Sequence, residues 1–291
     1  MVLGVVVSFL NEERFLTELL ESIAGQERPP DQLVLVDDGS SDGSYELARE
    51  FASHHAYAFA VQRPPQAGQR DRLARASELL AFQWAAHEHG REWDVVAKLD
   101  ADLRLPPCMF SEMERRLDAD ERLGIAGTYL TEERPDGTAG RIRIGDGHVH
   151  GATKFYRRAC WDGISPLPAI LGWDTIDEVR ARMCGWRTQS FALPGGDPVH
   201  LRPRGMHDGL LRGYRRWGEC AWAFGEPPAL VALQAARHMR QPPALRGGWH
   251  YALGWASAAL RRNARAEPEL RAYVGRRQWG RIRGRLRGRR P

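Results

Sequence analysis

The sequence predicts an α/β protein in which a parallel sheet is covered by helices on both faces. In the N-terminal third, short and continuously apolar runs alternate with segments whose apolar residues recur every three or four positions. Such alternation is typical of a parallel sheet buried on both faces. Three of the four apolar runs are followed by polar or acidic residues. Because ligands bind at the carboxyl ends of the strands in these sheets, we expect a binding site there.

The individual elements follow from local patterns. The first helix has apolar residues at positions 15, 16, 19, 20 and 23, and we expect Asn11 to cap it and Gly25 to end it. The strands predicted in this region are residues 2–7, 33–36, 57–61 and 95–99, and the later helices are residues 45–52 and 73–87. Beyond residue 103 the pattern predicts helices at 109–117, 173–183, 230–238 and 251–262, strands at 125–130, 141–144 and 152–156, and a turn at 134–140.

Composition and charge exclude several classes of protein. Hydrophobic residues make up 43% and charged residues 27% of the 291 residues, as in an ordinary soluble enzyme of one large or two small domains. The net charge of +5 arises at the end of the chain: residues 271–291 contain nine arginines and no acid, whereas the preceding residues carry 33 basic and 37 acidic side chains. The four cysteines lack zinc-site spacing, and no window is apolar enough to cross a membrane. We therefore expect a cytoplasmic protein with reduced thiols.

The most informative motif is Asp100-Ala101-Asp102, which follows an apolar strand. Side chains alternate along an extended segment, so the two carboxylates point to the same side. Carboxylate oxygens are ligands for hard divalent cations, and such a cation could hold a diphosphate. The alternative is an acidic loop that only serves solubility.

A second acidic pair, Asp37 and Asp38, lies at the end of another predicted strand, before a turn rich in Gly and Ser. These carboxylates can accept hydrogen bonds from a base or from ribose hydroxyls, and Asp42 or Ser44 can cap the next helix. A dinucleotide-binding fold would have Gly-x-Gly-x-x-Gly after its first strand, where this sequence reads SFLNEE. The sequence therefore argues against NAD binding.

Together these motifs resemble inverting family 2 glycosyltransferases of the GT-A fold, of the type that builds bacterial surface polysaccharides. The resemblance rests on SFLNEE, VDDGSSDGS and KLDADL. It continues through GAT at 151–153, YRR at 156–158, GWDT at 172–175, GWR at 185–187 and HLRP at 200–203. It covers residues 2–205, about two thirds of the chain.

The resemblance implies a Rossmann-like, mostly parallel sheet with helices on both faces and a helical C-terminal extension. It also implies three regions. Residues 1–103 would bind the nucleotide sugar, residues 104–220 would bind the acceptor, and residues 221–291 would form a helical region with an Arg-rich tail.

The resemblance assigns roles to residues at these motifs. Those expected to line the nucleotide-sugar pocket are Ser8, Phe9, Glu12, Asp37, Asp38 and Asp100. Asp100 and Asp102 would hold Mg2+ or Mn2+ against the diphosphate, with Asp102 as the direct ligand. His200 is a candidate third ligand, with a packing role as the alternative. Asp174 matches the catalytic base, which would take the proton of the acceptor hydroxyl in one displacement that inverts the anomeric centre.

The sequence departs from the family pattern at two places. Trp173 stands where the family commonly has Glu, which leaves Asp174, with Asp177 and Glu178 as substitutes one turn later. Residues 82–83, Phe-Gln, replace an Arg-Asn pair, so phosphate contacts would fall to Arg70, Arg72 or Arg75 unless these form a solvated helix face.

The expected function is metal-dependent transfer of a sugar from a nucleoside-diphosphate sugar to a hydroxyl of a glycan or lipid-linked acceptor. Two alternatives stay open: a polyprenyl-phosphate glycosyltransferase, and a catalytically silent binding or scaffold protein of the same fold. The Arg-rich tail is expected to contact an anionic membrane surface on the inner face of the cell membrane. An unstructured solubilising tail is the alternative, and nucleic acid is not an expected partner.

Overall fold

The computed structural model describes residues 1–63, 76–133, 139–142, 144–145, 147–202, 209–241 and 243–286. These residues form two compact units, each with its own packing. Unit 1 comprises residues 1–167 and 184–203, and unit 2 comprises residues 168–183 and the chain from residue 204 onward. The three regions predicted from the sequence are defined by ligand rather than by packing, and they stay predictions.

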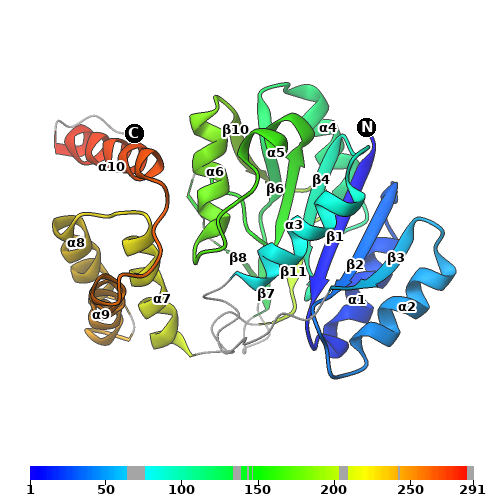
Figure 1. Cartoon of the computed structure of the whole chain (residues 1–291), viewed down its shortest axis with the longest axis horizontal. Coiled ribbons are helices and arrows are strands. Elements are labelled where there is room, and N and C mark those ends of the chain that lie inside the picture. The colour runs from blue at the N-terminus through cyan, green and yellow to red at the C-terminus, as the bar shows by residue number, and fades with distance from the viewer. Residues whose placement is uncertain are drawn as a thin grey trace. The chain divides into compact units, whose positions relative to one another are not determined.

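Unit 1 is built on a seven-stranded sheet (Figure 1). One strand, β9, is antiparallel to its neighbours, and all other pairs are parallel. Its strands, in spatial order, are β10 (Arg187–Phe191), β6 (Leu123–Thr128), β9 (Thr153–Arg157), β4 (Val95–Asp100), β1 (Leu3–Phe9), β2 (Gln32–Asp37) and β3 (Ala58–Gln62). The prediction of a mostly parallel sheet is confirmed. β1 and β2 are buried almost throughout because they lie inside the sheet with helices on both sides.

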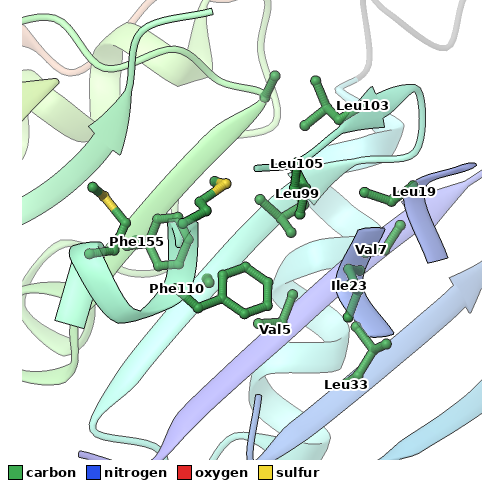
Figure 2. Packing of buried hydrophobic residues seen from close by; sticks show 14 of the residues in the cluster. Val5, Val7, Leu19, Ile23, Leu33, Leu99, Leu103, Leu105, Phe110 and Phe155 are labelled. Carbon is green, nitrogen blue, oxygen red and sulfur yellow. The ribbon is translucent and has the colours of Figure 1, made fainter. Parts of the chain in front are cut away.

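Helices cover both faces of this sheet. They are α1 (Glu13–Ala24), α2 (Ser44–His54), α3 (Ser77–His89), α4 (Met109–Ala119) and α5 (Arg158–Ile164). On one face, alternate residues of the strands pack against α1 and α4; Figure 2 shows Val5 and Val7 of β1 among Leu19, Ile23 and Phe110. On the other face, the ring of Phe82 in α3 lies 5.9 Å from that of Tyr156 and 5.0 Å from that of Trp161. Phe82, where the family pattern has Arg, is thus a core residue.

A second, four-stranded sheet in unit 1 has the order β5 (Leu103–Arg104), β11 (Val199–His200), β7 (Thr131–Glu133) and β8 (Ala139–Arg141). β11 pairs antiparallel with β5, so that His200 lies opposite Leu103. The strand expected at residues 141–144 is wrong in position, because β8 ends at Arg141. The expected turn at 134–140 falls largely outside the described residues.

Unit 2 is helical, as expected for the C-terminal extension. Its helices are α6 (Trp173–Met183), α7 (Leu210–Ala223), α8 (Pro228–His238), α9 (Arg246–Leu260) and α10 (Pro268–Leu286). α7 and α9 approach closely at glycines: a Cβ on Gly218 would lie 1.9 Å from the carbonyl oxygen of Tyr251. The sequence patterns predicted α6 with its observed bounds but missed α7. They gave no bounds for α10, which lies in the region 221–291 expected to be helical. Because α10 continues to Leu286, the alternative of an unstructured tail is wrong up to that residue.

Candidate active site

The carboxyl ends of the central strands bring the predicted polar residues together in unit 1. Ser8 at the end of β1 lies directly opposite Asp100 of β4, and Phe9 lies opposite Asp37 of β2. The side chain of Ser8 is buried, and its Oγ has no hydrogen-bond partner among the described residues. A buried hydroxyl without a partner is costly, so Ser8 offers a bond to a ligand at this edge of the sheet.

Beside Ser8, three side chains form a cluster that can hold a metal ion. Asp100, Asp102 and His200 each offer one ligand atom, and these atoms all lie within 4.8 Å of one another. His200 Nδ1 lies 2.6 Å from the carbonyl oxygen of Arg202, so this nitrogen donates, and in the neutral imidazole Nε2 is the nitrogen that can bind a metal. Nε2 faces Asp102, whose Oδ1 is 3.7 Å away. Two carboxylates and one oriented imidazole fit a divalent cation.

The electrostatics of the cluster also favour a cation. Burial, together with the nearby charge of Asp100, raises the pKa of Asp102. Burial raises the pKa of Glu12 to about 7, although the adjacent Arg202 opposes this shift. Several carboxylates therefore share a poorly solvated site, where they repel one another. A bound divalent cation would offset this repulsion.

Arg202 is a site residue to which the sequence reasoning gave no role. Its Nε lies 3.5 Å from Asp102 Oδ2, and its Nη2 pairs with Glu12 Oε2. The guanidinium also lies over the ring of Phe15, 5.2 Å from the ring centroid. A fixed positive charge beside the metal ligands is well placed to meet an anionic substrate. The available signal was its position in the HLRP motif.

Lys98 was missed as well. Its side chain is 2% exposed, and its Nζ pairs with both Asp100 and Glu78 of α3. Nζ also donates to the carbonyl oxygen of Gly151 at 2.9 Å. Lys98 thus holds the carboxylate of Asp100 in position. The signal in the sequence was that this arginine-rich chain has only two lysines, Lys98 and Lys154, which face each other on β4 and β9.

The loops after β1 and β2 are tied to each other. Glu12 N–H donates to Ser44 Oγ at 2.8 Å, and Ser41 N–H donates to Asn11 Oδ1 at 2.7 Å. The prediction that Asn11 caps α1 is wrong: Glu12 is the N-cap residue, and Asn11, at φ 54°, bonds to the neighbouring loop instead. At α2 the N-cap is Gly43, and Asp42 Oδ1 accepts the N–H of Ser44 at 3.1 Å.

The acidic pair at the end of β2 has two different environments. Asp37 is fully buried and accepts hydrogen bonds from Ser40 N–H (2.9 Å) and Gln62 Nε2 (3.1 Å), so its carboxylate stabilises the turn. Asp38 Oδ1 lies 3.3 Å from Nη1 of Arg63. Contacts of either residue with a nucleotide stay predictions.

The remaining predicted site residues belong to unit 2 or fall outside the described residues. Asp174 is in the first turn of α6, in unit 2, where Trp173, Asp177 and Glu178 are buried. Its role as a base stays a prediction. Arg70, Arg72 and Arg75 lie outside the described residues.

The parallel sheet and the acidic cluster at its edge define a glycosyltransferase of the GT-A fold. The sequence pattern described as "Glycosyl transferase family 2" matches residues 4–165, more than half of the chain. The chain therefore belongs to glycosyl transferase family 2, and the expected family, fold and enzyme class are confirmed.

Named relatives and solved structures are similar to parts of the chain. An undecaprenyl-phosphate 4-deoxy-4-formamido-L-arabinose transferase from Edwardsiella ictaluri is 36% identical over 137 residues, which are 46% of this chain and 38% of the relative. The transferase of the same description from Pectobacterium carotovorum is 38% identical over 108 residues, 36% of this chain and 30% of its own. The chain thus matches well under half the length of these relatives.

Two solved structures share the fold at low sequence identity. The first is a mannosyltransferase from Pyrobaculum calidifontis in complex with GDP-Man and Mn2+, with a TM-score of 0.56 and 17% identity over 97% of this chain and 80% of that one. The second is TarS from S. aureus in complex with UDP-GlcNAc, with a TM-score of 0.54 and 16% identity over 88% of this chain and 71% of that one.

Proposed function

We propose that this protein transfers a sugar from a nucleoside-diphosphate sugar, with Mg2+ or Mn2+ held by Asp100, Asp102 and His200. The observation that carries the proposal is the convergence of these three ligand atoms beside Ser8 at the carboxyl ends of β1 and β4. A cation bound there would neutralise charge on the departing nucleoside diphosphate. The complexes of the two solved relatives, with GDP-Man and Mn2+ and with UDP-GlcNAc, support this donor chemistry.

The residues around the cluster suit an anionic donor. Arg202 supplies a positive charge beside Asp102, and Ser8 offers its buried hydroxyl. Lys98 holds Asp100 in place. Asp174 takes the proton of the attacking hydroxyl, and a single displacement then inverts the anomeric centre.

The acceptor we propose is a hydroxyl of a glycan or lipid-linked glycan in cell-surface polysaccharide biosynthesis, at the cytoplasmic side of the membrane. A polyprenyl phosphate is the second candidate acceptor. It is favoured by one observation, the undecaprenyl-phosphate transferases that match 46% and 36% of this chain. A phosphate acceptor is already anionic and needs no strong general base.

The proposal is tested by thermal unfolding with UDP-, GDP- and dTDP-sugars in the presence and absence of Mn2+. We expect one class of donor to raise the melting temperature only when Mn2+ is present, because binding to the folded state alone stabilises it. The shift should vanish in Asp102→Asn. It should persist in the matched control Asp118→Asn, which changes an exposed aspartate of α4.

If no donor stabilises the protein in the presence of Mn2+, the silent scaffold alternative replaces this proposal. If a donor stabilises wild type and Asp102→Asn equally, Asp102 does not hold the metal and the proposed metal site is wrong.

A further inference from the structure

Helix α9 exposes an apolar stripe on the face opposite its packing face. Trp249, Leu253 and Leu260 are 60%, 39% and 86% exposed. Their spacing of four and seven residues places them on one side of the helix. Tyr251 and Ala258, on the other side, are buried. α9 is therefore apolar on both sides, and its packing within unit 2 uses only one of them.

Two shallow hollows between α7 and α9 are lined in part by residues of the stripe. One hollow is lined by Leu211 of α7, Trp249 and Arg246, among others. A second is lined by Arg215 of α7 together with Leu253, Leu260 and Arg261. Exposed apolar side chains that are contiguous and rimmed by polar groups mark an interaction site more often than scattered ones do.

The charge along α9 and in the chain around it has one sign, and the acidic Glu219 of α7 is paired with Arg215. Residues 227–266 contain six arginines and no aspartate or glutamate. Arg246 precedes the first turn of the stripe, and Arg261 and Arg262 follow its end; all three are exposed. An apolar stripe of Trp and Leu flanked by arginines is the pattern of a helix that lies in a membrane interface. Among the described helices, none is long and apolar enough to cross the bilayer.

We propose that the α7–α9 face of unit 2, defined by Trp249, Leu253, Leu260 and the flanking Arg246, Arg261 and Arg262, docks on an anionic lipid bilayer. Trp249 and the leucines enter the boundary between headgroups and acyl chains, where an indole is favoured. The arginines contact lipid phosphates at the two ends of α9. This surface is distinct from the Arg-rich tail, and the inference does not depend on the identity of donor or acceptor.

The same observations disfavour a second copy of the chain as the occupant. A twofold dimer through this face would bring like-charged arginine clusters near each other. Such juxtaposition costs free energy with no acidic residue of 227–266 to compensate.

The test is co-sedimentation of the full chain with phosphatidylcholine vesicles that contain or lack phosphatidylglycerol. We expect binding to the anionic vesicles only, weakened by added salt. Trp249→Ala/Leu253→Ala/Leu260→Ala should lower the partition coefficient at least about tenfold, because three apolar side chains that enter the bilayer are lost. Leu233→Ala, which removes a 60% exposed leucine of α8, is the matched control and should bind like wild type.

Two further measurements make the result decisive. Arg246→Gln/Arg261→Gln/Arg262→Gln should weaken binding and flatten its salt dependence, whereas replacement of Arg287, Arg289 and Arg290 by Gln should leave the contribution of the stripe intact. Thermal unfolding of the variants in α9 and at Arg261 and Arg262 should match wild type, since the altered side chains are exposed.

The inference is overturned if wild type binds no vesicle, or if the triple alanine variant binds like wild type. It is also overturned if the tail variant alone abolishes binding, or if light scattering shows a dimer that the triple alanine variant dissociates. None of these measurements uses donor turnover, so their failure is distinct from failure of the glycosyltransferase proposal.

Discussion

His200 Nε2 lies 3.7 Å from Asp102 Oδ1, and backbone hydrogen bonds between the two segments fix this approach. β11 pairs antiparallel with β5, and Leu201 N–H donates to the carbonyl oxygen of Asp102 at 2.9 Å. The imidazole is therefore presented to the carboxylates by main-chain hydrogen bonds. Three residues from two distant stretches of sequence become one ligand set in this way.

Replacement of His200 by Ala should weaken Mn2+ binding by about 10- to 100-fold, because one ligand and its fixed orientation are lost. The measurement is the Mn2+ concentration that gives half-maximal donor-dependent thermal stabilisation. His87→Ala changes an exposed histidine of α3 and should leave this concentration unchanged. An unchanged value in His200→Ala would assign His200 to packing.

Replacement of Lys98 by Met should reduce both stability and metal affinity. Removing Lys98 leaves the carboxylate of Asp100, which is 27% exposed, without this partner and lets it reorient. The cost should lie between the value for an exposed ion pair, about 1 kcal/mol, and that for a fully buried one, about 3–5 kcal/mol. Urea unfolding measures the first effect and Mn2+ titration the second.

Gln26→Leu provides the control for Lys98. Gln26 is buried like Lys98 and contacts the start of α4. Its amide donates to the carbonyl oxygen of Pro106 and accepts the N–H of Phe110. It should lower stability without changing the Mn2+ requirement. If Lys98→Met and Gln26→Leu alter metal binding alike, Lys98 has no positioning role.

Replacement of Asp174 by Asn distinguishes the two acceptor classes. Loss of a general base should lower the rate of transfer to a hydroxyl about 10²- to 10⁴-fold. Transfer to a polyprenyl phosphate should be nearly unaffected, because that acceptor is already deprotonated. The measurement is single-turnover transfer with each acceptor, and full activity of Asp174→Asn on a hydroxyl acceptor would remove Asp174 from the mechanism.

Replacement of Gly218 by Ala should destabilise unit 2. The new Cβ would lie 1.9 Å from the carbonyl oxygen of Tyr251, so α7 and α9 would have to separate, at a cost of about 2 kcal/mol or more. Gly213→Ala is the control on the same helix, where a Cβ meets nothing within 4 Å. It should raise stability by about 0.5–1 kcal/mol through helix propensity. Calorimetric unfolding of both variants is the measurement.

Glu226 should make the stability of unit 2 depend on pH. Burial raises the pKa of its carboxyl, although hydrogen bonds from Gln278, Tyr251 and Gln234 oppose this. The folded chain therefore keeps this proton to higher pH than the unfolded chain, and stability falls as pH rises from the ordinary value through the folded pKa.

Glu226→Gln removes this titration. The free energy of unfolding of wild type, relative to Glu226→Gln, should decrease with rising pH across that window. A difference that is constant or increases with pH would contradict the assignment.

Local patterns in the sequence predicted the sheet and two of the three residues of the candidate metal site. Continuous apolar runs predict buried parallel strands, and strand alternation places Asp100 and Asp102 on one side; both arguments are local. Burial of the strands and convergence of the three ligand atoms agree with them.

The resemblance named His200 as a candidate third ligand, but only the tertiary structure decided which residues lie beside the acidic pair. His200 and Arg202 contact the acidic cluster through pairings between segments far apart in the chain, which no local pattern encodes. Lys98 lies two residues before Asp100 on β4, but its contacts with Glu78 and Gly151 are also long-range. Similarly, Asn11 does not cap α1 as expected, because its side chain accepts a hydrogen bond from Ser41 N–H in the next loop. α7 escaped prediction because Gly213 and Gly218 interrupt its apolar pattern, and Gly218 is required by the approach of α9, which is visible only after packing.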